Sequence, residues 1–276
     1  MIRSLLIRGM IAGLVAGLIG FAFARGFGET SVARAIAFEE QHEHAEAAHP
    51  HDHGDAELVS RDTQAGLGLL TGVAVFGTAL GGLFSLVFAF AYGRLGPLRA
   101  RGTSALLALF GFVSVAIVPF LKYPPNPPAV GNPETIGPRT ALFFGMVAIS
   151  IAAAVFAVRL QRRIQARHGA WNAALIAGAT YIVVVVIAQV ALPAVDEVPA
   201  DFSASLLWNF RLAAIGIQAL IWTTLGLVFS ALAARELERP VLRSVGLFFL
   251  VLWRRDARAV RRRARVSPHR PVSGTS

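Results

Sequence analysis

The sequence has no cysteine and little charge, and each shortage excludes a class of protein. Without cysteine there is no disulfide framework, thiolate metal site, covalent haem attachment or cysteine nucleophile. Only 15% of the 276 residues are charged and 55% are hydrophobic, whereas soluble domains have about 25% charged and 45–50% apolar residues. This composition argues against a soluble enzyme domain and against a disordered chain. Lysine is also scarce, because Lys122 is the only lysine among 26 basic residues, and this arginine bias is typical of a GC-rich bacterial genome.

Long apolar segments take the place of the missing charge. Six of them stand out, at residues 4–24, 67–92, 104–121, 140–158, 171–192 and 212–234. A helix needs about 20 apolar residues to cross a bilayer, and Arg8 is the only charged residue inside any of the six. We predict an all-α integral membrane protein with six transmembrane helices arranged as three hairpins. Residues 1–239 would form the membrane domain and 240–276 a basic cytoplasmic tail.

The first segment has a second interpretation. Arg3 and Arg8 followed by an apolar run and Ala22-Phe23-Ala24 resemble a signal peptide with its cleavage site. Against cleavage, Gly9, Gly13 and Gly17 recur every four residues on one helical face, and small residues at that spacing let transmembrane helices pack closely. We predict a retained span, with Arg8 reaching the nearer headgroups.

Charge alternates between successive connections and predicts the orientation. The two termini and the connections at 93–103 and 159–170 are basic, whereas the connections at 25–64 and 193–211 are acidic overall. Basic residues stay on the cytoplasmic side. Both termini are therefore expected in the cytoplasm of a bacterial inner membrane, with 25–64, 122–139 and 193–211 outside. The arginine-rich tail is expected to lie on anionic lipid, and no nucleic-acid partner is expected.

The external connections carry the features that suggest a function. The second holds five prolines between Pro124 and Pro133, and the third holds Asp196, Glu197 and Asp201. Prolines stiffen an extended loop, and carboxylates offer oxygen ligands to a cation or are simply solvated. We expect these two loops to shape the mouth of a path. An arginine precedes the second helix of each hairpin, namely Arg61, Arg139 and Arg211.

A histidine run in the first external connection is the most specific chemical signal. Five of the seven histidines fall within twelve residues, at His42, His44, His49, His51 and His53. Neutral imidazole ligates late first-row divalent ions such as cobalt, nickel, copper and zinc. Acidic neighbours would attract such a cation. We predict a mobile, low-affinity site that gathers metal, while a pH sensor and a plain spacer remain alternatives.

Polar groups inside the predicted spans are few. Gln189 and Gln218 would lie in the outer half of the bilayer, where they either hydrate a cation path or bridge helices by hydrogen bonds. No span holds an acid for a carboxylate proton relay. The sequence also lacks a phosphate loop and a zinc-protease motif. We therefore expect no enzymatic activity and no resident cofactor.

Several loop motifs resemble one known family. They are ETSVARAIAFEE from Glu29, VSRDTQAGL from Val59, LKYPPNPPAVG from Leu121, PETIGPRT from Pro133, LPAVDEVPAD from Leu192 and LLWNFRL from Leu206. Together they resemble the predicted cobalt transporter subunit CbtA over about residues 1–235. The resemblance implies cobalt uptake for cobalamin synthesis and a small one-span partner, CbtB, with a His-rich end.

Taken together, the sequence predicts a membrane permease subunit for a divalent transition metal, most plausibly cobalt. The alternative is a membrane sensor or scaffold that binds metal outside and acts through its arginine-rich tail without transporting. Metal accumulation in cells distinguishes the two.

Overall fold

The computed structural model describes residues 1–46, 60, 63–128 and 130–238, and every regular element within them is a helix. The α-helices are α1 (Ile2–Phe23), α2 (Glu29–Glu46), α4 (Leu69–Ala91), α5 (Ala100–Gly111), α6 (Val118–Lys122), α7 (Ile136–Ala191) and α8 (Ala204–Leu237). Three π-helical turns, η1 (Ala24–Gly28), η2 (Gln64–Gly68) and η3 (Phe112–Ile117), and one 3₁₀ turn, η4 (Pro133–Thr135), join or precede them. The described residues contain five helices long and apolar enough to cross a membrane. The all-helical membrane prediction is therefore confirmed.

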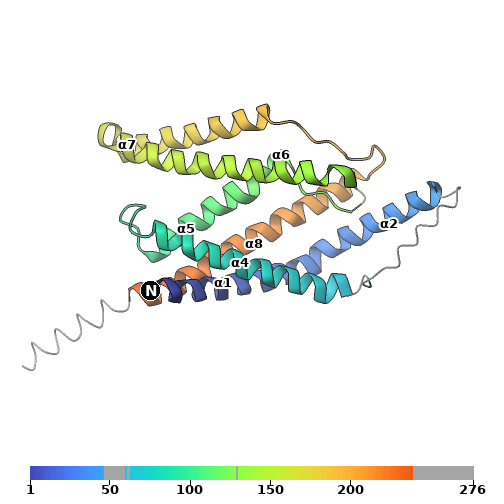
Figure 1. The fold of residues 1–276 in the computed structure, drawn as a ribbon, viewed down its shortest axis with the longest axis horizontal. Coiled ribbons are helices and arrows are strands. Elements are labelled where there is room, and N and C mark those ends of the chain that lie inside the picture. Colours follow the sequence, from blue (N-terminus) through green and yellow to red (C-terminus); the bar gives the residue numbers. More distant parts are fainter. Residues whose placement is uncertain (47–59, 61–62, 129, 239–276) are drawn as a thin grey trace, which may run out of the picture.

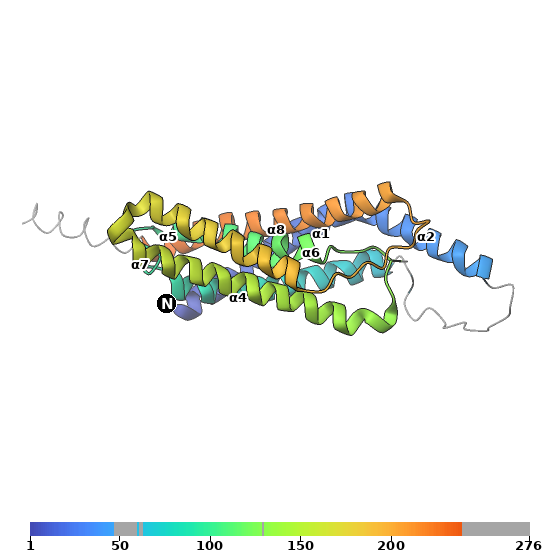
Figure 2. The ribbon, with the colours of Figure 1, turned by 90° about the horizontal axis from the view of Figure 1, so that it is seen from above.

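Two of the six predicted segments, 140–158 and 171–192, lie on the single element α7. Gly169 interrupts α7 with a φ of 74° and a ψ of 163°, a positive φ that glycine adopts without a Cβ clash. The chain folds back there, and its two arms run side by side in both views (Figures 1 and 2). A hydrogen bond of 2.9 Å between the hydroxyls of Ser150 and Tyr181 joins the arms.

The first predicted span is wrong at its outer boundary. The helix does not stop at Ala24 but continues through η1 into α2, which ends at Glu46, so the expected loop 25–64 is helical over its first half. The segment is rich in alanine and glutamate, which favour helix. A search for apolar segments identifies only the apolar first part of this long helix, because the residues beyond it are largely polar.

Glycines on α1 and α4 allow the closest helix contact in the fold. A Cβ on Gly13 would lie 2.0 Å from the carbonyl oxygen of Gly77, and one on Gly81 would lie 2.1 Å from that of Gly9. This confirms the predicted packing face of Gly9, Gly13 and Gly17. Phenylalanines from α4 and α8 complete the core: Phe88 and Phe229 are fully buried, and their ring centroids are 5.0 Å apart.

Arg8 ties the start of α1 to the end of α8. Its Nη1 donates to the carbonyl oxygen of Leu232 at 2.9 Å, and its Nη2 pairs with the carboxylate of Glu236. The prediction that Arg8 reaches the headgroups is wrong, because a carboxylate and a carbonyl at the negative end of a helix dipole lie within its reach. The pair fixes the start of α1 and the end of α8 at the same end of the bundle.

The connections separate into two sets at opposite ends of the bundle (Figure 1). The N-terminus, the α4–α5 connection, the bend at Gly169 and the end of α8 share one end, which we call the terminus end. The end of α2, segment 123–132 and segment 192–203 share the other, which we call the loop end.

Candidate functional site

Three chain segments meet at the loop end and build a small apolar core of their own. Ala35 of α2, Val130 and Phe202 are buried there together. The ring of Phe38 meets that of Phe202 edge-on, with 5.0 Å between their centroids. The helix that carries the first histidines is therefore anchored to both of the other loops.

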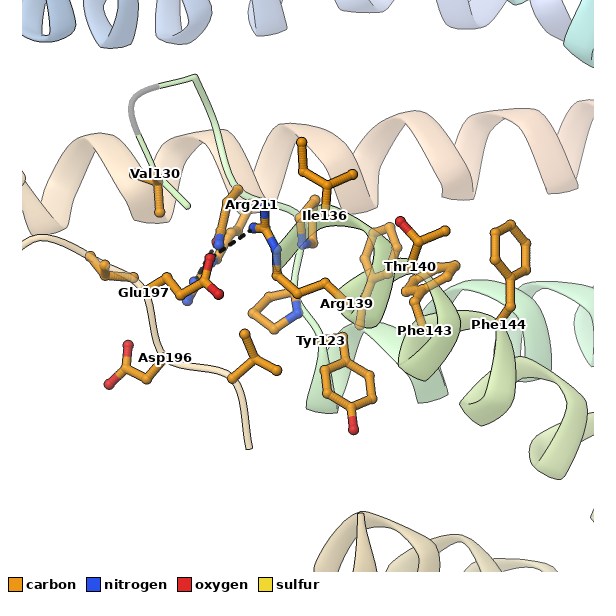
Figure 3. A pocket seen from close by; sticks show the side chains of 16 residues that line it. Tyr123, Val130, Ile136, Arg139, Thr140, Phe143, Phe144, Asp196, Glu197 and Arg211 are labelled. Atoms are coloured by element: carbon orange, nitrogen blue, oxygen red, sulfur yellow. Dashed lines mark hydrogen bonds and ion pairs between the residues drawn. The ribbon is translucent and has the colours of Figure 1, made fainter. Parts of the chain in front are cut away.

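Next to this core is a cavity of about 560 Å³, which we call the loop pocket (Figure 3). Its walls come from α6, segment 123–132, the first turns of α7, residues 195–198 and the first turns of α8. The aromatic and proline side chains in the walls are Phe120, Tyr123, Pro124, Pro125, Phe143 and Phe144. The polar ones include Asn126, Arg139, Thr140, Asp196, Glu197 and Arg211. Two of the five prolines and two of the three acids predicted to shape a mouth, Pro124, Pro125, Asp196 and Glu197, thus line one cavity.

Glu197 locks the two loops together. Its Oε2 accepts the backbone N–H of Asn132 at 2.9 Å and lies 3.3 Å from Nη1 of Arg139. The hydroxyl of Thr135, the N–H of Asn132 and the guanidinium of Arg139 hold the pKa of Glu197 below its ordinary value of 4.5, because each favours the ionised form. The carboxylate therefore keeps its charge to an unusually low pH.

Gly131 lets the proline-rich loop approach Arg139. Its φ is 121°, and an added Cβ would lie only 2.4 Å from Nη1 of Arg139. Arg139 also donates from Nη2 to the carbonyl oxygen of Asn132 at 3.2 Å. The carbonyl oxygen of Asn132 and the carboxylate of Glu197 thus both bind the guanidinium of Arg139.

Arg211 enters the loop pocket from α8. Its Nη2 donates to Oδ1 of Asn126 at 2.9 Å, and this is its only hydrogen bond to the described residues. Asp196 is close enough to interact with it through space. Arg139 and Arg211 were expected just before their helices, whereas both lie inside them, in α7 and α8. Nothing in the sequence indicated that they share a cavity, since they are 72 positions apart.

Below the pocket, polar groups follow the contact between α6, η3 and α7. The Tyr123 hydroxyl donates to the carbonyl oxygen of Pro193 at 2.9 Å, and the Gln189 amide donates to that of Val118 at 2.9 Å. Deeper in the bundle, the Tyr181 hydroxyl lies 2.9 Å from that of Ser150 and 3.4 Å from that of Ser114. We call this set the polar seam.

Of the two glutamines predicted along a path, Gln189 bridges helices. Gln218, on α8, makes no hydrogen bond within the described part of the chain. Ser114 lies in η3, five residues before Pro119, which belongs to the first turn of α6. Proline lacks an N–H, so Pro119 cannot donate the α-helical hydrogen bond to the residue four positions earlier. The wider π-helical turn η3 lies directly before this residue's helix. π-Helical turns are frequent at functional sites.

The predicted histidine site lies only partly within the described residues. The backbone of His42 and His44 is helical at the end of α2, one turn beyond Phe38, whereas His49, His51 and His53 lie outside the described residues. The first two members of the run are thus helical where a loop was expected, and metal binding by the run stays a prediction. Among the described residues, no three His, Cys, Asp or Glu side chains gather as a metal site.

The substitution Glu197→Gln should destabilise the protein in a pH-dependent way. A lowered pKa means that the ionised carboxylate contributes stability fully above pH 4.5, and that this contribution is lost as the pH falls through the lowered value. The thermal midpoint of the variant should lie below that of the wild type at pH 6, and the difference should be smaller at about pH 4, below the ordinary value of 4.5. Thermal unfolding of the purified protein in detergent measures both.

Glu134→Gln is the matched control, because Glu134 is exposed on the neighbouring turn and its carboxylate makes no hydrogen bond to the described residues. It should leave the midpoint unchanged at both pH values. Equal effects of the two substitutions would contradict the role given to Glu197.

A comparison with protein-family models identifies one match. The model described as "Probable cobalt transporter subunit (CbtA)" matches residues 2–234. Neither a curated protein nor a solved structure matches the chain. The matched range covers every described helix almost to the end of α8.

Proposed function

Because the chain belongs to the CbtA family of probable cobalt transporter subunits, we propose that it is the permease subunit through which a divalent transition metal enters the cell. Cobalt is the first candidate, with cobalamin synthesis as its use. The observation that carries the proposal is the family match over 2–234 on a chain with five apolar helices long enough to span a membrane. The role is transport without catalysis.

The proposed topology has six crossings, with both termini in the cytoplasm of the bacterial inner membrane. The two arms of α7 cross separately, since they fold back at Gly169. The alternation of charge supports this orientation, because the connections at the terminus end are basic, whereas the loop end holds most of the acids. The packing of α1 against α4 supports its retention as a span.

Reporter fusions test the topology. A reporter fused after Ser276 should give a cytoplasmic signal, and a reporter inserted within residues 50–56 should give a periplasmic signal. A periplasmic signal from the Ser276 fusion would overturn the orientation.

The proposed route begins at the histidine run and passes the loop pocket to the polar seam. The Phe38–Phe202 contact supports this order, since it anchors α2 beside the loops of the pocket. Hydroxyl and amide groups bind a cation weakly, and weak sites favour release as well as binding. A membrane potential of 100 mV contributes about 4.6 kcal/mol to the inward movement of a doubly charged ion, twice the value for one charge.

Two partners belong to the proposal. A family of transporter subunits implies other subunits, and we propose a small one-span protein with a His-rich end. Anionic lipid is the proposed partner of the arginine-rich tail, 240–276, which lies outside the described residues.

Cobalt accumulation tests the function. Cells expressing the chain, with the proposed one-span partner, should take up labelled cobalt faster than cells with an empty vector, and nickel and zinc should be used as competitors. A metal sensor or scaffold would leave the rate at the empty-vector level, and that result would overturn the permease role.

A further inference from the structure

The loop pocket contains more positive charge than its position suggests. Segments 122–139 and 193–211 hold three basic residues, and two of them, Arg139 and Arg211, line this one cavity. The proposed orientation puts both on the side that transmembrane proteins usually leave poor in arginine. Asp196 and Glu197 line the same cavity, so its charged side chains balance and a bare divalent cation meets no excess of negative charge there.

The two arginines differ in whether an acidic side chain forms an ion pair with their guanidinium group. Glu197 neutralises Arg139 at 3.3 Å. Arg211 donates to the neutral amide oxygen of Asn126, and within the described residues it makes no hydrogen bond to Asp196. Its Nε is buried without a partner, but its Nη1 is neither buried nor bonded to a described residue. An accessible guanidinium nitrogen without a partner can donate a charged hydrogen bond to a carboxylate oxygen.

The size and walls of the pocket favour an organic ligand. Its volume of about 560 Å³ is typical of small-molecule sites. Phe143, Phe144 and Tyr123 give apolar walls, which pack against a carbon skeleton and not against a hydrated ion.

We propose that the loop pocket binds the metal as a complex with an organic polycarboxylate, and that Arg211 binds a carboxylate of that complex. The inference rests on the proposed function, since it names the form in which the metal arrives. The charges agree: a 1:1 complex of Co²⁺ with the citrate trianion carries one negative charge, which complements the one guanidinium left without an acidic hydrogen-bond partner. The ligand also supplies metal-binding atoms, which the described residues do not gather into a cluster.

Retention of labelled citrate by the full chain in phosphatidylcholine nanodiscs tests the proposal. Following citrate avoids the background from metal held by the histidine run. The wild type should bind citrate with Co²⁺ more tightly than citrate alone. Arg211→Gln should weaken that binding about tenfold or more, as expected for a lost charged hydrogen bond, and Arg211→Lys should lose less, because it keeps the charge.

Lys122→Gln is the matched control, since it removes one positive charge at the same end of the molecule outside the pocket lining. It should leave citrate binding unchanged, and equal thermal midpoints would show that all variants fold. Three results would overturn the proposal: no citrate retention, equal loss in Lys122→Gln and Arg211→Gln, or citrate binding that Co²⁺ does not strengthen. Loss of binding when phosphatidylglycerol is added to the discs would also overturn it, by assigning the site to a lipid phosphate.

The outcome is separable from that of the proposed function. Cobalt uptake without citrate binding would contradict the proposed polycarboxylate site, and the proposed permease role would stand. Citrate binding without uptake would leave the site and remove the permease role.

Discussion

Gly81→Ala should cost the protein about 3 kcal/mol or more of unfolding free energy, at the upper end of over-packing substitutions. The new Cβ would lie 2.1 Å from the carbonyl oxygen of Gly9 and 2.7 Å from Cα of Gly13. Both atoms belong to the backbone of α1, which cannot rotate away as a side chain does, so α1 and α4 must separate. The thermal midpoint of the purified protein in detergent should fall by about 5–10 °C.

Gly72→Ala provides the control on the same helix. A Cβ at this position meets nothing within 4 Å, and alanine favours helix over glycine by about 0.8–1 kcal/mol. The control should therefore match or exceed the wild-type midpoint. If both substitutions lowered it equally, the loss would reflect glycine replacement in α4 generally and not the contact with α1.

The fold was predictable where it depends on local pattern. Uninterrupted apolar runs identified the helices that suit lipid, and the spacing of Gly9, Gly13 and Gly17 identified the face of α1 that meets α4. Both signals follow from the helical repeat and the thickness of a bilayer. They require no knowledge of which segments become neighbours.

What the sequence did not predict depends on distant partners or on structure outside lipid. Arg8 was assigned to headgroups, because its partner Glu236 lies 228 positions away. The continuation of the first helix into α2 was missed. The residues of α2 are too polar to be identified as a membrane segment, although alanine and glutamate favour helix.

The loop pocket shows the same division. The proline-rich and acidic loops were predicted to shape a mouth, and they do line one cavity. The pairing of Arg139 with Glu197 was not predictable, because it requires the start of α7 to meet a loop nearly sixty residues later. Local composition indicated where a site would be, and tertiary contacts decided which charges it holds.

Replacing His42, His44, His49, His51 and His53 together by glutamine should lower cobalt uptake at scarce metal and leave it nearly unchanged at abundant metal. A gathering site raises the local concentration of the ion, so its benefit vanishes once the path is saturated. A position at the outer start of the proposed route suits this role, since the run begins one turn beyond Phe38, whose ring packs on Phe202 of the third loop. Initial rates of labelled cobalt uptake over a range of concentrations measure the effect.

The difference between wild type and variant should also fade below about pH 6, because protonated imidazole does not ligate metal. His168→Gln is the matched control, since His168 lies beside the bend at Gly169, at the terminus end, and it should leave uptake unchanged throughout. Uptake abolished at every cobalt concentration would make the run an obligatory site on the path. Uptake unaffected at every concentration would make it a spacer. The gathering role requires the intermediate result, in which uptake falls at scarce cobalt and is nearly unchanged at abundant cobalt.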